Sequence, residues 1–169
     1  MPEHISRLEQ ALAQLLSERR TAALATLGAD DGCPFVSMTP YAIDGAQPAL
    51  VLHVSALAAH TANMAAHPAV SILIAARDVP GAPVHDLPRI TLTGTAQTPT
   101  AGSAPWQSAR QAYLARFPDT EHMTALPDFR FVTIAPHGAR QIAGFGAARS
   151  VQADELLRVL RRVAAAAGV

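Results

Sequence analysis

Residues 55–74 read SALAAHTANMAAHPAVSILI, and the interpretation of the whole chain starts from them. They follow a strongly apolar run at residues 50–54, and a second apolar run begins after His67 and Pro68. The simplest interpretation is a strand, a short helix that begins near a capping Ser55, and another strand. The first turn of such a helix has free N–H groups and the positive end of the helix dipole, so it is a natural place to hold an anion.

Size and composition favour one compact domain. The chain has 169 residues, half of them apolar, and we expect a single domain over residues 1–169. No apolar run approaches the ~20 residues that span a bilayer, and the N-terminus lacks the apolar core of a signal peptide. A cytoplasmic protein without membrane association is therefore expected. Cys33 is the only cysteine, which excludes an intrachain disulfide and a cysteine metal cluster.

The charged residues exclude several classes of function. All 13 basic residues are arginine, and they balance 13 acidic residues. Nucleic-acid-binding proteins usually carry a basic excess, so no nucleic-acid partner is expected. The absence of lysine excludes Schiff-base and lysine-nucleophile mechanisms. The chain also has no Walker loop, no Gly-x-Ser-x-Gly elbow and no His-Glu-x-x-His metal motif.

The segment before residue 55 predicts a helix followed by three strands. Ser6 and Glu9 fit a capping box, which places the helix over about residues 5–18. Turn signals at Asp30-Asp31-Gly32 and at Asp44-Gly45 separate the strands. Because short turns join successive strands, an antiparallel meander is favoured. The predicted strands are residues 21–27, 34–43 and 49–54.

The segment after residue 69 predicts four more strands and two helices. Residues 78–88 contain three prolines and form a loop, and Gly94 suggests a bulge or a close backbone approach in the strand that follows. The predicted strands are residues 70–76, 89–97, 129–135 and 139–143, and the helices are residues 104–117 and about 154–167. About seven antiparallel strands with few helices favour a mainly β (α+β) fold, a closed or partly closed barrel over about residues 20–148.

Three polar side chains fall within the predicted short helix. His60, Thr61 and Asn63 stand close to the proposed anion position. The alternative is a solvated helix face, and the chemistry of the residues leaves the two interpretations about even. His60 and His67 lack the spacing of a metal pair, so no metal site is predicted.

Other polar residues lie on the predicted strands. Ser37, Thr39 and Tyr41 alternate along one face of the second strand, where they leave room for a flat ligand or simply face solvent. Arg89 opens the strand after the proline-rich loop, and its guanidinium suits either a phosphate or a surface ion pair with Asp86. We interpret Gly144-Phe145-Gly146 as a tight exit from a strand.

Several short motifs between about residues 20 and 150 form a recognisable set. They are Leu24-Ala25-Thr26-Leu27, Gly32, Pro34, Ser37, Tyr41, Ser55, Leu57-Ala58, His60-Thr61, Asn63-Met64, Pro68, Val70-Ser71, Arg89-Ile90-Thr91-Leu92, Gly94, Gly144-Phe145-Gly146 and Ala148. The most specific part is the pattern in residues 55–64. Together these motifs resemble the pyridoxamine 5′-phosphate oxidase-like FMN-binding split barrels, in particular the branch related to haem utilisation, here in a short form without a C-terminal domain.

The resemblance implies an antiparallel split β-barrel with flanking helices, an FMN cofactor, and a homodimer with two flavin sites at the interface. The implied function is an oxidoreductase acting on a small-molecule substrate, and no catalytic residue is assigned. His60 stands where the oxidase proper has lysine. The isoalloxazine and ribityl chain would lie against Ser37, Met38, Thr39 and Tyr41. The phosphate would be held by Ser55, His60, Thr61, Asn63 and Arg89.

Two other functions remain open. One is haem binding with oxidative degradation, which the branch suggests, although no histidine lies beyond His137 to act as a C-terminal axial ligand. The other is a non-catalytic flavin-binding dimer.

Overall fold

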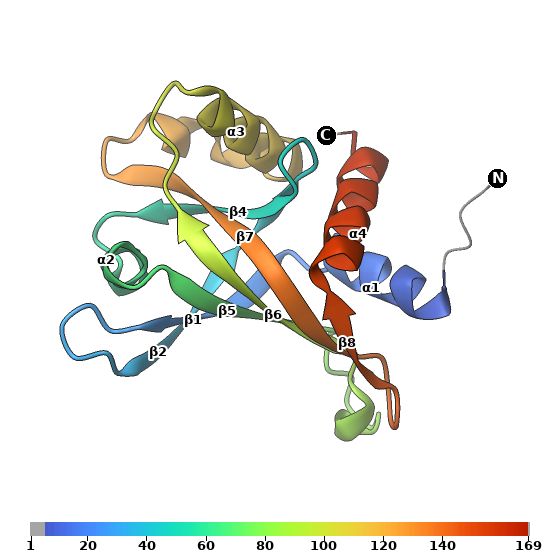
Figure 1. The fold of residues 1–169 in the computed structure, drawn as a ribbon. Helices are drawn as coiled ribbons and strands as arrows, with labels where there is room; N and C mark the ends of the chain where they lie inside the picture. The colour runs from blue at the N-terminus through green and yellow to red at the C-terminus, as the bar shows by residue number, and fades with distance from the viewer. Residues whose placement is uncertain (1–5, 169) are drawn as a thin grey trace.

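The fold is a curled antiparallel sheet with helices at its edges (Figure 1). The computed structural model describes residues 6–168, so residue 5 of the predicted first helix and the extreme ends of the predicted domain lie outside them. The helices are α1 (Arg7–Glu18), α2 (Ala59–Ala66), α3 (Ala104–Arg116) and α4 (Ala153–Ala166), with 3₁₀ turns η1 (Val84–Asp86) and η2 (Pro118–Ala125). The strands are β1 (Thr21–Leu27), β2 (Pro34–Pro40), β3 (Ala42–Asp44), β4 (Ala49–Ser55), β5 (Ala69–Ala75), β6 (Arg89–Gln97), β7 (Phe129–Ile142) and β8 (Ala148–Gln152).

The order of the strands explains how the sheet closes. It runs β2-β1-β5-β6-β7-β4-β3, every pair is antiparallel, and β8 pairs with β7. The two edges, β2 and β3, are separated in sequence only by Tyr41, so the sheet bends back on itself. The predicted split barrel is confirmed. The two hairpins of the predicted meander are confirmed, β1 with β2 and β3 with β4, but the chain crosses from one edge of the sheet to the other between β2 and β3, and β4 pairs with β7 on its other side.

The predicted strand over residues 34–43 is two strands. Pro40 ends the pairing of β2 with β1, and the N–H of Tyr41 donates to the carbonyl of Arg20 outside the ladder. The Tyr41 side chain is fully buried, and its hydroxyl donates to the carbonyl of Leu16 at 2.9 Å. Tyr41 therefore marks the corner at which the chain passes from one edge of the sheet to the other.

Two apolar clusters hold the barrel together. The inner one combines the inward side chains of the strands with buried leucines and valines of α1 and α4, which pack against each other at one end. The capping box of Ser6 and Glu9 is confirmed at the start of α1. The outer cluster lies under α3, where Tyr113 and Phe117 pack on Phe131, and His53 lies against the rings of Tyr113, Phe129 and Phe131.

The predicted turn at residues 136–138 is wrong, because β7 is one continuous strand. The register between β6 and β7 shifts between Thr93 and Gly94, which confirms the predicted bulge, and Pro136 pairs with Gly94 at that point. A proline without an N–H is tolerated in a strand where a bulge interrupts the ladder. The short strand β8 was not predicted; Gly144-Phe145-Gly146 forms the connection between β7 and β8.

None of the helices in residues 6–168 combines the length and the apolar character that crossing a bilayer requires.

Candidate functional site

The start of α2 lies at the end of β4 and beside β2 (Figure 1). The helix begins at Ala59, and its N-cap is Ala58, which has no capping side chain. The prediction of Ser55 as the N-cap is therefore wrong. Its hydroxyl instead accepts from the N–H of Leu57 at 3.1 Å and donates to the Asp128 carboxylate at 3.1 Å.

Two N–H groups in the first turn of α2 are open to a ligand. Within residues 6–168, the N–H groups of Ala59 and His60 donate to no backbone or side-chain acceptor, whereas those of Ala58 and Thr61 are bonded within the turn. Free N–H groups at the positive end of a helix favour an anion. This part of the predicted anion site is compatible with the structure.

His60 points from this turn toward β2. Its Nδ1 lies 3.0 Å from the hydroxyl oxygen of Ser37, and no other hydrogen bond involves the ring within the described residues. The ring is half-buried, and this desolvation lowers the pKa of His60 below its ordinary value of 6.5. The lowered pKa favours the uncharged imidazole, in which Nδ1 lies at Ser37 and Nε2 makes no hydrogen bond within the described residues.

Thr61 and Asn63 bond to the protein itself. The hydroxyl of Thr61 donates to the carbonyl of Ser55 at 2.6 Å. The Asn63 side chain accepts from the N–H of Ala29 at 2.9 Å and donates to the hydroxyl of Thr26 at 3.0 Å. Both side chains are buried. Neither predicted interpretation, an anion ligand or a solvated face, describes them, because they attach α2 to β1 and β4.

Replacing Asn63 by alanine should therefore destabilise the protein without any ligand present. The change leaves the N–H of Ala29 and the hydroxyl of Thr26 without their partner in a buried place, and we expect the free energy of unfolding to fall by about 2–3 kcal/mol. Urea denaturation of the ligand-free protein measures this. An unchanged urea midpoint would mean that the Asn63 side chain does not stabilise the ligand-free fold and is available to a ligand.

The candidate site residues predicted on the strand over residues 34–43 differ in their burial and in the face of the sheet on which they lie. Ser37 is half-buried beside His60, whereas Met38 lies on the opposite face and is 67% exposed. Thr39 is buried, and its hydroxyl has no hydrogen-bond partner. Tyr41 belongs to the core, where burial raises the pKa of its hydroxyl well above the usual range. Tyr41 therefore cannot border a ligand at α2, and only Ser37 contacts His60.

Arg89 lies away from α2 in the single chain. β5 begins three residues after α2 ends, and its far end, Ala75, pairs with Arg89. A seven-residue strand is roughly 20 Å long. The guanidinium of Arg89 donates to the carbonyl of Leu87 at 2.8 Å, and it makes no ion pair with Asp86. Within one chain, Arg89 therefore lies at the end of β5 and β6 that is far from α2.

Two features of this region were not predicted from the sequence: the partner of Ser55 and a hollow beside α2. Asp128, which fixes Ser55, lies 73 residues away, and no local pattern could have pointed to it. Phe35 shares a face with Ser37 and is 41% exposed, and with Ala59 and Asn63 it lines a hollow of about 440 Å³ beside α2. Across the described chain, no three side chains of His, Cys, Asp or Glu gather to hold a bare metal ion.

The sequence model of the pyridoxamine 5′-phosphate oxidase family matches residues 8–143. The chain belongs to this family. The match covers most of the barrel, including α2 and its two neighbouring strands. The resemblance seen in the sequence is thereby confirmed.

Relatives within the family have names that refer to haem. The heme oxygenase HutZ of Vibrio cholerae is 28% identical over 152 residues, which are 89% of this chain and 85% of that protein. Among solved structures, a heme-binding protein from Mycobacterium smegmatis is 26% identical with a TM-score of 0.79. That comparison covers 90% of this chain but only 61% of the mycobacterial chain. The structure of HutZ, described as a heme storage protein, gives a TM-score of 0.72 at 26% identity and covers 79% of this chain and 94% of HutZ. These relatives confirm the predicted haem-utilisation branch.

Proposed function

We propose that this protein binds haem at the start of α2 and that Nε2 of His60 would ligate the iron. The observation that carries the proposal is the neutral His60 imidazole, whose Nδ1 lies 3.0 Å from the Ser37 hydroxyl. A histidine that ligates a metal through one nitrogen usually donates its other N–H to a fixed partner, which sets the tautomer and the ring orientation. With iron on Nε2, the proton resides on Nδ1 and is donated to Ser37.

The groups at the start of α2 suit haem better than they suit a phosphate. A phosphate is held best by cations, and burial keeps His60 uncharged. An iron ligand, in contrast, must be unprotonated. The free N–H groups of Ala59 and His60 can donate hydrogen bonds to a propionate carboxylate of the haem in the place where the sequence predicted an anion.

Two relatives with haem in their names support this proposal, and one of them is named an oxygenase. When bound, haem supplies an iron centre that can react with oxygen. The protein's contribution is to bind the haem, to orient His60 through Ser37, and to anchor the acidic edge on the first turn of α2. Oxidative degradation of the haem is the enzymatic activity that we propose for this site.

The second candidate is FMN, and the family match favours it. The same free N–H groups would hold the phosphate, and Ser37 would lie near the ribityl chain or ring. In this case the protein is an oxidoreductase for an unassigned small substrate, or a flavin-binding dimer without turnover. Neutral His60 is the feature that fits this candidate less well.

Parallel titrations of ligand-free protein separate the two candidates. Haemin is added while the Soret band is followed, and FMN is added in a second series while flavin fluorescence is followed. The proposal predicts a saturable Soret shift at one haem per chain and weak or absent flavin quenching. Tight flavin quenching without a Soret shift would reverse the assignment.

The pH dependence of binding gives a second separation. A proton on Nε2 competes with iron, and the pKa of His60 lies below 6.5. Haem affinity should therefore be constant above about pH 6.5 and should fall by up to about tenfold per pH unit below the lowered pKa. Titrations at a series of pH values test this, with His60→Ala as the control that removes the dependence. If His60 instead holds a phosphate as a cation, affinity will rise as the pH falls.

We also propose a homodimer through the outer face of β1, β2 and β5. Val36 and Met38 are exposed on β2, and Leu73 is exposed on β5. Ala23 of β1 pairs with both Met38 and Leu73, so these side chains form one apolar patch across three strands. An exposed apolar patch of this kind marks an interaction surface. Ser37 of the same strand faces His60 on the opposite side of β2, so the patch and the proposed haem site lie on the two faces of one strand.

The dimer offers a place for Arg89. In such a dimer, the two-fold axis would lie in the plane of this face and run across the strands. The end of the sheet that carries Arg89 in one copy would then lie beside α2 of the other copy. The arginine that is roughly a strand's length from α2 within one chain would then complete the site in the other, where it could pair with a propionate or a phosphate.

Replacing Leu73 by glutamate should separate the dimer. The side chain is 39% exposed in one chain, so the fold tolerates a charge, but two carboxylates would face each other near the axis. We expect at least about a hundredfold weaker association. Size-exclusion chromatography with light scattering measures the mass, and Leu126→Glu, at a similarly exposed leucine of the segment after η2, is the control. A wild-type protein that is monomeric at tens of micromolar would remove the proposal.

A further inference from the structure

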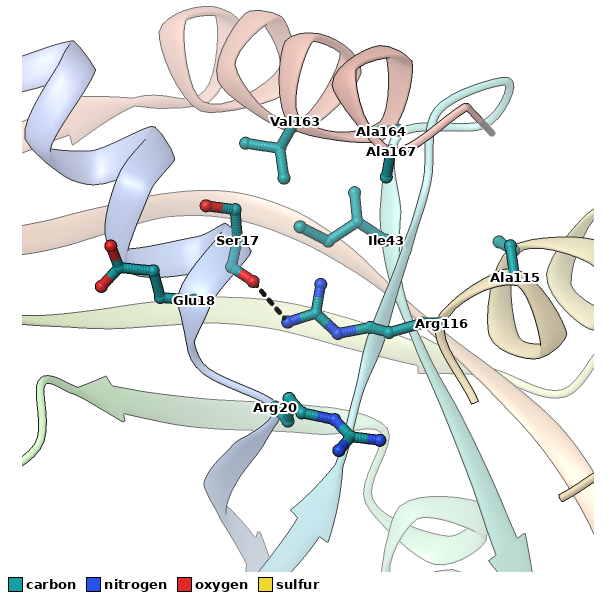
Figure 2. Close-up of a pocket in the computed structure, with 10 residues that line it drawn as sticks. Ser17, Glu18, Arg20, Ile43, Ala115, Arg116, Val163, Ala164 and Ala167 are labelled. Atoms are coloured by element: carbon teal, nitrogen blue, oxygen red, sulfur yellow. Dashed lines mark hydrogen bonds between the residues drawn. The ribbon is translucent and has the colours of Figure 1, made fainter. Parts of the chain in front are cut away.

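A pocket of about 330 Å³ lies between the ends of three helices (Figure 2). It is formed where the C-terminal ends of α1, α3 and α4 meet β3, and none of the residues at the start of α2 contributes to it. Six of its lining residues are apolar: Ile43, Ala112, Ala115, Val163, Ala164 and Ala167. Its volume lies at the lower end of the range of small-molecule sites, about 300–1,000 Å³.

We propose that this pocket binds a small amphipathic carboxylate, with the head group on Arg116 and Arg20 and the apolar tail against α4 and β3. Arg116 reaches from the end of α3 into the middle of the pocket, as Figure 2 shows. Arg20 lines the same pocket, and its guanidinium lies over the ring of Phe117. The two cations therefore lie at one side of an otherwise apolar hollow.

The guanidinium of Arg116 is only partly satisfied by the protein. One terminal nitrogen, NH2, donates to the last carbonyls of α1, those of Leu16, Ser17 and Arg19. The Nε group is buried without a partner, and the other terminal nitrogen takes part in no hydrogen bond within the described residues. Burial lowers the pKa of Arg116, and the neighbouring positive charge of Arg20 adds to this effect. An anion in the pocket would relieve both costs.

No carboxylate of the described chain neutralises this pair. The ion pairs in residues 6–168 involve Arg110, Arg149 and Arg158, and none involves Arg20 or Arg116. Glu18 lines the pocket, but its carboxylate accepts from the Gln14 side chain and points away from Arg116 in Figure 2. The orphan carbonyls of α1 are already bonded to Arg116, and those at the end of α4 accept from Ala167 and Gly168. Two uncompensated positive charges therefore remain at the mouth of an apolar pocket.

Octanoate is the probe of this site, since it combines a carboxylate with a short apolar chain. Isothermal calorimetry on the full-length, haem-free protein compares octanoate with octanol, which lacks the charge, and with acetate, which lacks the tail. A charge-assisted hydrogen bond and the apolar burial should each contribute at least about tenfold to the affinity of octanoate. Binding of octanol as tight as that of octanoate would overturn the proposal.

Blocking the pocket gives the decisive variant. Ala115 is exposed on α3 at the pocket, so Ala115→Trp fills it without disturbing the core, and octanoate affinity should fall at least about tenfold. Ala165→Trp, at an exposed position of α4 that does not line the pocket, should bind octanoate like the wild type. Equal affinities in the two variants would place octanoate elsewhere. Arg20→Gln should weaken octanoate and leave octanol unchanged, and haem binding should be unaffected by all three variants.

Discussion

Haem affinity is expected to fall more than about a hundredfold when His60 is replaced by alanine. Removing a group that merely orients a metal ligand costs about 10–100-fold in metal affinity, and removing the ligand itself should cost more. We expect this loss because, among the groups at the start of α2, only the His60 imidazole has a free lone pair suited to iron. Haemin titration followed at the Soret band measures the loss.

Two further variants distinguish ligation from a general disturbance of α2. His67 follows the last residue of α2, so His67→Ala changes a histidine at the opposite end of the same helix and should leave haem affinity unchanged. Ser37→Ala removes the partner of Nδ1 and should weaken haem by about tenfold. Equal losses in His60→Ala and His67→Ala would show that the site has been misplaced.

The largest effect on stability is expected for Gly94→Val. A Cβ at this position would lie 2.6 Å from the carbonyl oxygen of Ala135 and 2.8 Å from a methyl group of Ile134. Both atoms belong to β7 at the bulge, so relief requires the central pair of strands to move apart. Overpacking of a core typically costs about 1–3 kcal/mol, and we expect the upper end, about 3 kcal/mol, because one of the clashing atoms is backbone.

Urea denaturation with circular dichroism measures this loss. The neighbouring Thr93→Val is the control, because Thr93 is exposed on the outer face of β6 and a valine there should change the free energy of unfolding by less than about 0.5 kcal/mol. If Gly94→Val were no less stable than Thr93→Val, the close approach of β6 and β7 at the bulge would be wrong.

Most helices and strands were predicted because the sequence pattern that specifies each of them lies within the element itself. Residues 21–27 and 89–97 were predicted with the bounds that the structure has, since alternation of buried and exposed residues lies within each strand. The closure of the barrel was not predicted in detail. It depends on Tyr41 as a corner and on the pairing of β4 with β7, which lies more than 70 residues further along the chain. The continuous β7 was missed for the same reason, because the bulge beside Pro136 is defined only by the pairing of β7 with β6.

The sequence predicted that Ser37 and α2 belong to one site, and the structure brings Ser37 and His60 together, but the partners of several other predicted residues were not predicted. Thr61 and Asn63 were interpreted as ligand contacts, yet their partners are Ser55, Ala29 and Thr26, and those contacts require the folded chain. The uncharged state of His60 also depends on burial, which a sequence does not display. An uncharged histidine is better suited to bind iron than to hold a phosphate, so this state favours haem over FMN.

The most direct test of His60 as the iron ligand is the iron–histidine stretching band in the resonance Raman spectrum of the ferrous haem complex. We expect the band in the wild type and in His67→Ala, and we expect it to be absent from His60→Ala and restored when imidazole is added to that variant. A band that persists in His60→Ala without imidazole, or a wild-type complex without the band, would contradict the proposal that His60 binds the iron.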